Sequence, residues 1–352
     1  MRLAFYAPMK PPTHPVPSGD RTMARALMRA FETAGATVTL AHDLRVRDGR
    51  GDDAVQRDLM ARAEALVPDL VSRGRQAGWQ AWITYHSYYK APDLPGAAVA
   101  RALGIPYLLI EATRARKRLG GPWDRFARAA EAACDAADTV FYLTHRDRDA
   151  LAAYGPATQR LIHLPPFLPR SDLPPLAKGQ NLLAVGMMRE AAKLPSYELI
   201  ARTLQKVPDA PDLDIAGDGP ARDAVARAMV PLHGRVHWLG GLDKDALSHT
   251  YARARALIWP GVDEAFGMTY LEAQAHGLPV IAQDRPGVRD VLYPGDYPAP
   301  EDGADGLAAH LRATLAHPPD PHAIRAWITK NHLLPAASAT LAQGLSDLGV
   351  SP

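Results

Sequence analysis

Short, wholly apolar segments recur along this chain, and they constrain its fold more than any other feature. Strands that are apolar throughout are buried on both faces, as in parallel sheets covered by helices. Segments of helical length and composition separate these runs, so the pattern predicts an α/β protein with doubly wound parallel sheets. The runs are RLAFYA, TVTLA, AWITYH, YLLIE, TVFYL and RLIHL in the first half, and LLAVG, LDIAG, RVHWLG, ALIW and PVIA in the second.

The length of the chain and one proline-rich stretch predict the domain organisation. A chain of 352 residues is long enough for about two domains. Residues 163–180 contain five prolines and almost no helical periodicity, which is typical of a stiff interdomain linker. We therefore expect an N-terminal domain over residues 1–170 and a C-terminal domain over 171–325. Residues 326–352 are too few for a domain and are expected to pack back across the domains as helices.

Several classes of protein lack support in the sequence. No apolar run approaches the roughly 20 residues of a membrane helix, so we expect a cytoplasmic protein. The single cysteine, Cys134, excludes an internal disulfide and is expected in a helix core. The chain has no motif of a zinc hydrolase, a serine hydrolase or a P-loop protein. Its basic residues are scattered without a nucleic-acid-binding pattern, and no nucleic-acid partner is expected.

The positive charge of the chain is concentrated in its first half. Residues 1–165 contain 23 Lys and Arg against 17 Asp and Glu, whereas the rest contains 17 against 21. Four cations within five residues, Arg114 and Arg116 to Arg118, follow Glu111 at the end of the run YLLI. These cations could bind an anionic acceptor or lipid head groups, or be solvated. Peripheral contact with the anionic inner face of a membrane is therefore a separate hypothesis.

Two carboxylates eight residues apart, Glu264 and Glu272, flank a glycine in the segment VDEAFGMTYLEAQAHGLPVI. The segment follows the run ALIW and predicts a helix that begins near Gly267. Free N–H groups at a helix start favour an anion by about 0.3–1 kcal/mol, and a diphosphate would suit that position. Glu272 lies among apolar residues, where ribose hydroxyls would supply the donors that its carboxylate needs. The alternative is a capped helix with one acid in a salt bridge.

Other predicted strand ends carry residues suited to a ligand. Arg189 and Lys193 follow the run LLAV, and a turn rich in glycine, GDGPAR, follows LDIA. A surface ion pair and an ordinary turn are the alternatives for these two segments. In the first half, Ser18 and Gly19 open a helix predicted for residues 20–34. His86 ends the run AWITY, where a histidine can serve a site or have a structural role.

GDGPAR and the segment from RVHWLGG to RDVL resemble the C-terminal half of the retaining glycosyltransferases of family 4. That family has the GT-B fold, in which two Rossmann-like domains face each other across a cleft. The likeness covers residues 181–310 well and the N-terminal half more loosely. Its most specific element is the Glu-x7-Glu motif, here Glu264 and Glu272. Three departures stand out. Met187 and Met188 precede Arg189, and Ser18 and Gly19 stand where the family has paired glycines. Glu-Ala-Thr replaces a histidine common after the fourth strand.

The resemblance implies a role for each matching residue. In the family the first acid lies by the donor sugar, the second holds the ribose, and the amides between them meet the diphosphate. The resemblance implies a catalytic set of Glu264, His86, Arg189 and Lys193. The implied donor-binding set is Glu272, Phe266, Gly267, Met268, Thr269, Gly217, Asp218, Gly219, Ser18 and Gly19. The residues expected on the acceptor side are Lys90, Glu111 and Arg114.

A protein of this kind would transfer a sugar from a nucleoside diphosphate to a glycan or a lipid-linked acceptor with retention at the anomeric carbon. A leaving phosphate oxygen would take the acceptor proton, while cations and the helix start stabilise the leaving charge. We therefore expect no metal and no cofactor, with the nucleotide sugar as substrate. The alternatives are a nucleotide-sugar epimerase or phosphorylase of the same fold, or a non-catalytic nucleotide-sugar-binding protein.

Overall fold

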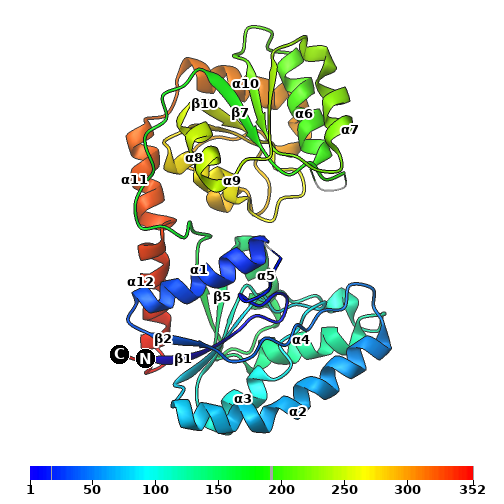
Figure 1. The fold of residues 1–352 in the computed structure, drawn as a ribbon, viewed down its shortest axis with the longest axis vertical. Coiled ribbons are helices and arrows are strands. Elements are labelled where there is room, and N and C mark those ends of the chain that lie inside the picture. The colour runs from blue at the N-terminus through cyan, green and yellow to red at the C-terminus, as the bar shows by residue number, and fades with distance from the viewer. Residues whose placement is uncertain (17, 191–192, 352) are drawn as a thin grey trace. The chain divides into compact units, whose positions relative to one another are not determined.

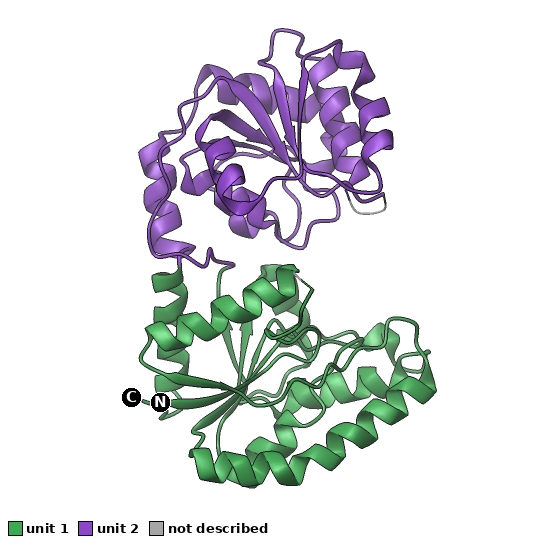
Figure 2. Cartoon of the chain, in the orientation of Figure 1, with its two compact units in different colours: residues 1–165, 334–352 green, residues 166–333 purple. Residues whose placement is uncertain are grey.

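The computed structural model describes residues 1–16, 18–190 and 193–351. The chain divides into two compact units, one of Met1–Pro165 with Leu334–Pro352 and the other of Pro166–Leu333 (Figure 2). Within the described residues each unit contains one parallel sheet, and helices cover the two faces of each sheet (Figure 1). Each predicted apolar run forms a strand. The prediction of an α/β protein with two doubly wound parallel sheets is therefore confirmed.

The first unit is built on a six-stranded sheet in the order β2 (Thr37–Leu40), β1 (Arg2–Tyr6), β3 (Ala81–Tyr85), β4 (Tyr107–Ile110), β5 (Thr139–Tyr142) and β6 (Arg160–His163). The central strands β3, β4 and β5 are buried along their whole length because helices cover both faces. The strand order reverses between β1 and β3. In open α/β sheets such a reversal separates the loops at the carboxyl edge and opens a crevice for a ligand.

The helices of the first unit cover both faces of this sheet (Figure 1). One face carries α1 and α12, which pack against each other, and the other carries α2, α3 and α4. The predicted inward residues of α1, namely Met23, Leu27, Ala30 and Phe31, are all buried. The helices are α1 (Gly19–Thr33), α2 (Asp53–Ala77), α3 (Gly96–Leu103), η1 (Arg116–Arg118), α4 (Asp124–Ala136), α5 (His145–Tyr154) and α12 (Leu334–Ser346).

The second unit is built on a five-stranded sheet in the order β11 (Val280–Ile281), β10 (Ala254–Ile258), β7 (Asn181–Val185), β8 (Leu213–Ala216) and β9 (Val236–Gly240). Numbered along the chain within this unit and read from β9, the strands have the 3-2-1-4-5 order of a mononucleotide-binding sheet. The order reverses between β7 and β10. The helices are α6 (Leu194–Gln205), α7 (Arg222–Met229), η2 (Val230–Leu232), α8 (Lys244–Ala252), α9 (Met268–Ala275), η3 (Arg289–Val291), η4 (Pro300–Asp302), α10 (Gly303–Ala316) and α11 (Pro321–Asn331). Helices α6, α7 and α10 pack together, and α8 and α11 pack against α9.

The boundaries of the units differ from the predicted 170/171 and 325/326. The chain leaves the first unit after Pro165, and most of the proline-rich stretch packs onto the second unit. In that unit Leu168 N donates to His332 O over 2.8 Å, and Ala177 N donates to His276 O over 2.8 Å. The C-terminal segment is shared, because α11 belongs to the second unit and α12 to the first. None of the described helices combines the length and the apolar composition needed to cross a membrane.

Candidate functional site

The carboxyl edge of the second sheet brings the loops after β7, β8 and β10 together. Glycines allow the first two loops to touch through their backbones. A Cβ on Gly217 would lie 1.9 Å from the carbonyl oxygen of Gly186, and one on Gly219 would lie 2.5 Å from that of Met188. Met188 N donates to Asp218 O over 2.9 Å, which ties the two loops together. The glycine-rich turn after β8 is therefore required by close packing at this edge.

The loop after β10 presents Glu264 at the point where the strand order reverses. Lys193, which follows β7, contacts the Oε1 of Glu264 through its ammonium group. Trp259 Nε1 donates to the same oxygen over 2.9 Å. The side chains of Lys193 and Glu264 are only 18% and 14% exposed, so this ion pair is largely removed from water. Two residues that the sequence predicted for one site, 71 positions apart, thus meet in the structure.

Trp259 joins this ion pair to the core of the second unit. Its ring lies edge-on to that of Tyr197, with centroids 5.1 Å apart, and its carbonyl oxygen accepts a hydrogen bond from Tyr270 Oη over 3.1 Å. The side chain is 1% exposed. A Cβ on Gly186 would come within 2.7 Å of the indole. The indole is therefore fixed on several sides, and it holds Glu264 in place.

The side chain of Arg189 lies apart from the ion pair of Lys193 and Glu264. Its side chain is exposed and contacts Met187 Sδ at 3.5 Å. Among the contacts of the described residues, the guanidinium of Arg189 contacts neither Lys193 nor Glu264. Its backbone is tied to the following turn, since its carbonyl oxygen accepts from Lys193 N over 3.0 Å. Its role in binding a diphosphate stays a prediction.

The start of α9 lies next to Glu264 along the chain. Gly267 has φ of 85°, and a Cβ there would lie 2.6 Å from the ring of Tyr270. Asp263 and Gly261 also have positive φ, so the loop between β10 and α9 turns sharply and repeatedly. Phe266, Gly267, Met268 and Thr269 are half-buried at the first turn. The N–H groups of that turn have no partner within a helix, which makes it suited to an anion.

Glu272 lies in the second turn of α9 and has a protein partner that the sequence did not predict. Tyr251 Oη donates to its Oε2 over 3.0 Å. Burial raises the pKa of the Glu272 carboxyl, while the Tyr251 hydrogen bond and the charge of Lys244 lower it in part. The ring of His276 stacks on Tyr251 at 5.6 Å, and its Nδ1 donates to Pro175 O over 2.8 Å. Glu272 is thus held in a partly desolvated position where hydroxyl donors would stabilise its charge.

The carboxyl edge of the first sheet contains a second cluster of predicted residues. Ser18 caps α1, with its Oγ accepting from Arg21 N over 3.2 Å, and the space around Gly19 is open. His86 follows β3, and its Nδ1 lies 3.0 Å from Oδ1 of Asp20 in the first turn of α1. These residues stand on the two sides of the reversal between β1 and β3. The ligand crevice of such a sheet lies at this point.

His86 and Glu111 share an unusual backbone conformation. Their φ values are 61° and 57°, in the left-handed region that non-glycine residues rarely adopt. His86 N donates to Ile110 O and Glu111 N donates to Phe141 O, both over 2.9 Å, so each backbone is held by the neighbouring strand. Burial raises the pKa of Glu111, partly offset by the charge of His86 and a hydrogen bond with Tyr85. Strain of this kind concentrates at functional sites.

The remaining acceptor-side predictions have different outcomes. Lys90 lies over the rings of Tyr89 and Trp123, at 5.6 and 5.5 Å from their centroids, together with Arg118. The expectation for Arg114 is wrong as far as access is concerned. Its side chain is 1% exposed and pairs with Glu131 and Asp135 of α4 at 2.7 and 2.6 Å. A guanidinium engaged in this way ties the loop to α4 and does not face an acceptor.

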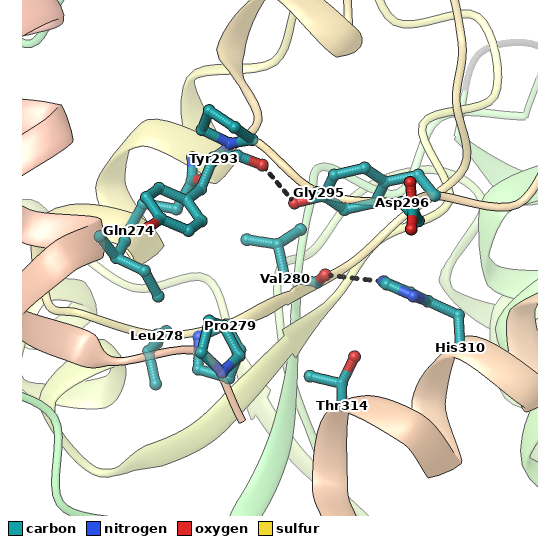
Figure 3. Close-up of a pocket in the computed structure, with 13 residues that line it drawn as sticks. Gln274, Leu278, Pro279, Val280, Tyr293, Gly295, Asp296, His310 and Thr314 are labelled. Atoms are coloured by element: carbon teal, nitrogen blue, oxygen red, sulfur yellow. Dashed lines mark hydrogen bonds between the residues drawn. The ribbon is translucent and has the colours of Figure 1, made fainter. Parts of the chain in front are cut away.

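A separate cavity of about 180 Å³ lies beside Val280, the first residue of β11 (Figure 3). Its wall includes Val280, Tyr297, His310 and Thr314. His310 Nε2 donates to Val280 O over 3.3 Å, and burial lowers the pKa of this histidine. None of the residues predicted for the site lines this cavity. In the part of the chain that the structure describes, no group of three or more His, Cys, Asp or Glu is placed to hold a metal ion.

Comparison with known proteins finds a family match within the second unit. Residues 179–317 match the family model described as glycosyl transferases group 1. The match covers 139 of the 352 residues. The group 1 segment begins at the strand that precedes Lys193 and includes both acids of the Glu-x7-Glu motif.

Several named proteins are similar in sequence to parts of this chain. A phosphatidyl-myo-inositol mannosyltransferase from Mycolicibacterium smegmatis is 30% identical over 152 residues, which cover 42% of this chain and 35% of that protein. A sulfoquinovosyl transferase from Arabidopsis thaliana is 30% identical over 112 residues, which cover 32% of this chain and 20% of that protein. The matched parts thus span about a fifth to a third of these relatives.

Solved structures resemble the whole chain. Sucrose-phosphate synthase from Thermosynechococcus elongatus has a TM-score of 0.69 at 17% identity, and the match covers 99% of both chains. The lipopolysaccharide outer core galactosyltransferase WaaB has a TM-score of 0.68 at 18% identity, again over 99% of both chains. At such identities the likeness concerns the fold alone, and that fold is GT-B.

Sequence reasoning missed three residues of these clusters. Trp259 was expected only as the end of the run ALIW, and no role was expected for Tyr251. Asp20 was expected only as part of a helix start. Each acquires a role through a contact with a residue between 5 and 66 positions away. The contact between Asp20 and His86 could have been predicted from the sequence. One residue lies in the first helical turn after β1 and the other directly after β3, and both positions flank the reversal of the sheet.

Proposed function

We propose that this chain transfers a sugar from a nucleoside diphosphate to a glycan or lipid-linked acceptor with retention at the anomeric carbon. The observation that carries the proposal is the carboxyl edge of the second sheet, where Lys193, Glu264 and the start of α9 lie within a segment of the group 1 family. The cation suits the diphosphate of such a donor, and the carboxylate suits the hydroxyls of its sugar. The helix start suits the negative charge that develops on the leaving diphosphate.

The donor would be held by residues of this edge in distinct roles. The diphosphate would lie at the N–H groups of residues 266–269, with Lys193 and Arg189 supplying positive charge. The turn of residues 217–219 lies against the loop after β7 and would border the same phosphates. Glu272 would accept hydrogen bonds from the ribose hydroxyls, each worth roughly 1.5–3 kcal/mol to a charged group. Tyr251 already holds one of its oxygens and fixes its orientation.

Binding of the donor would change the partner of Lys193. In the structure its ammonium pairs with Glu264. A diphosphate carries more charge than one carboxylate and would draw the ammonium toward itself. Glu264 would then keep its hydrogen bond from Trp259 and orient hydroxyls of the donor sugar. The ion pair thus holds Lys193 and Glu264 close together at the position where the donor would bind.

Departure of the diphosphate generates positive charge at the anomeric carbon and negative charge on the leaving oxygen. Lys193, Arg189 and the helix start would stabilise the leaving oxygen, which is the main electrostatic task. That oxygen would accept the proton of the incoming hydroxyl on the same face of the sugar, which gives retention. We propose that these groups neutralise the diphosphate without a bound metal. Activity that is unchanged in excess EDTA would support this part of the proposal.

The test uses the intact chain with UDP- and GDP-linked sugars. Relatives named as mannosyltransferases and a sulfoquinovosyl transferase make hexose donors the first choice. The acceptors are octyl α-mannoside, octyl β-glucoside and vesicles containing phosphatidylinositol. Nucleoside diphosphate should appear only when an acceptor is present, and the one-bond C1–H1 coupling constant of the product should show the same anomeric configuration as the donor. An inverted product contradicts retention, whereas release of nucleotide by phosphate alone, or binding without turnover, contradicts glycosyl transfer.

A further inference from the structure

The first unit holds a histidine and an aspartate on the two sides of its topological reversal. Asp20 lies in the first turn of α1, directly after the loop that follows β1, and His86 lies directly after β3. Their contact joins His86 Nδ1 to Asp20 Oδ1 over 3.0 Å, and the side chains are 22% and 29% exposed. The pair is therefore sheltered yet open to a ligand. No other strand ends of this sheet lie on the two sides of the reversal.

The ring of His86 is fixed by its surroundings. Its backbone has φ of 61° and is bonded to Ile110 O. Its centroid lies 5.7 Å from that of Tyr85 and 5.0 Å from that of Tyr88. A carboxylate only accepts hydrogen bonds, so the contact with Asp20 places the proton on Nδ1. The other ring nitrogen, Nε2, is then the one with a lone pair for a ligand.

Carboxylates face this histidine from three different elements. They are Asp20 of α1, Glu111 at the end of β4 and Asp147 in the first turn of α5, and the phenol of Tyr85 lies beside Glu111. Burial lowers the pKa of His86, but these charges outweigh it and raise the pKa above the usual value. The same hydrogen bond is the main cause that lowers the pKa of Asp20. Asp20 is thus charged and coupled to the ring through a direct bond.

We propose that Asp20 is a positioning residue that fixes the ring and tautomer of His86, so that Nε2 accepts a hydrogen bond from the acceptor hydroxyl. The proposal rests on the proposed glycosyl transfer and assigns the acceptor side of that reaction to this edge of the first unit. A sugar hydroxyl fits this nitrogen because it is a neutral donor. An anionic group would be repelled by the charge of Asp20 beside the ring.

The first test follows the histidine itself and needs no substrate. The C2 proton of His86 is assigned by its loss in His86→Gln and titrated by NMR in wild type, Asp20→Asn and Glu32→Gln. Glu32 lies at the far end of the same helix and is exposed, so it serves as the matched control. Because an opposite charge in contact shifts a pKa by about 1–3 units, Asp20→Asn should lower the midpoint by at least about one pH unit. An unmoved midpoint overturns the proposal.

The second test measures the reaction with whichever of octyl α-mannoside, octyl β-glucoside and phosphatidylinositol vesicles supports turnover. Asp20→Asn should raise the KM for that acceptor about 5- to 50-fold, leave the KM for the nucleotide sugar unchanged, and move the acidic limb of the pH profile to lower pH. An equal rise in both KM values, or a lower Tm as the only change, would show a structural role for Asp20 and overturn the proposal. A wild type that is silent toward all acceptors rejects the proposed function, whereas an active enzyme with an unmoved limb rejects the role of Asp20 alone.

Discussion

The carboxyl edges of the two sheets contain different kinds of residue. The edge of the second sheet relies on glycines, close backbone contacts and one shielded ion pair, Lys193 with Glu264. The edge of the first sheet relies on two strained residues, His86 and Glu111, and on carboxylates gathered around a ring. Glycine and cations suit a diphosphate, while a histidine among acids suits a neutral hydroxyl. Under the proposed function, the edge of the second sheet would therefore bind the donor and the edge of the first sheet would bind the acceptor hydroxyl.

A histidine in each unit shows the same contrast in protonation. Burial lowers the pKa of His276, which is 2% exposed, to about 4, although its hydrogen bond to Pro175 opposes the shift. Carboxylates raise the pKa of His86 in spite of its burial. One ring is therefore neutral near pH 7 and braces Tyr251, whereas the other gains a proton more readily. The surroundings of each ring, rather than the residue type, determine what it can do.

The largest expected effect tests whether the chemistry resides at the edge of the second sheet. Glu264→Gln removes the charge and keeps an oxygen to accept from Trp259 Nε1. We expect kcat to fall by about 100- to 1000-fold, as for other preorganised groups that act on developing charge. Nucleoside diphosphate release is the measurement, and Glu198→Gln on the exposed side of α6 is the control. A loss smaller than about threefold in kcat would contradict the role of Glu264, because a transition-state contact is worth more.

The next effect tests the opposite behaviour of the two histidines. The unfolded chain binds a proton to His276 near pH 6.5, whereas the folded chain does so only near pH 4. The stability contributed by neutral His276 is therefore present above about pH 6.5 and is lost on acidification through pH 4, by up to roughly 3 kcal/mol. Hydrogen exchange of α9 peptides in wild type and His276→Gln measures the difference between the two proteins.

For His86 the sign is reversed. Its folded pKa is raised, so the stability that it contributes is fully present below pH 6.5 and is lost as the pH rises through the folded value. Exchange of β3 peptides in wild type and His86→Gln should show this opposite trend. If the protection of the β3 peptides and of the α9 peptides changes in the same direction with pH, the predicted electrostatic contrast between His86 and His276 is wrong.

Much of the fold could be predicted because its signals are local. Each apolar run became a strand, since burial of both faces depends on the composition of a few consecutive residues. The Glu-x7-Glu motif is local too, because Glu264 and Glu272 lie in one loop and the helix that follows it. The unit boundary was harder to place. Prolines predict an extended chain, and they do not tell which unit the extended chain packs against.

Contacts between distant segments explain what could not be predicted. Arg114 belongs to a run of cations that looks exposed, and its burial follows from Glu131 and Asp135, four residues apart on one face of α4. The other cations of the run also differ from a uniform basic patch, since Arg118 lies over Trp123 and Arg116 over Tyr154. Contact with an anionic membrane stays a prediction.

A smaller effect separates donor binding from chemistry at the same edge. Glu272→Gln removes the charge that the ribose would meet while leaving an oxygen for Tyr251. The affinity for a nucleoside diphosphate should fall about 10- to 100-fold, since each hydrogen bond to a charged group contributes roughly 1.5–3 kcal/mol. Calorimetric titration with UDP and GDP measures the change, and kcat at saturating donor should change little. Unaltered affinity for both nucleotides would remove the ribose from this position.

The smallest effect concerns Trp259, which the sequence presents only as the end of a strand. Trp259→Phe keeps an aromatic ring against Tyr197 and removes one hydrogen bond to Glu264, whose oxygen Lys193 still contacts. A net loss of about 1 kcal/mol, or roughly fivefold in kcat/KM, is expected for such a bond. Trp238→Phe on β9, where the residue is 38% exposed, is the matched control. Trp259 positions Glu264 only if its variant lowers kcat/KM without an equal loss in the control. Equal effects would contradict the positioning role of Trp259.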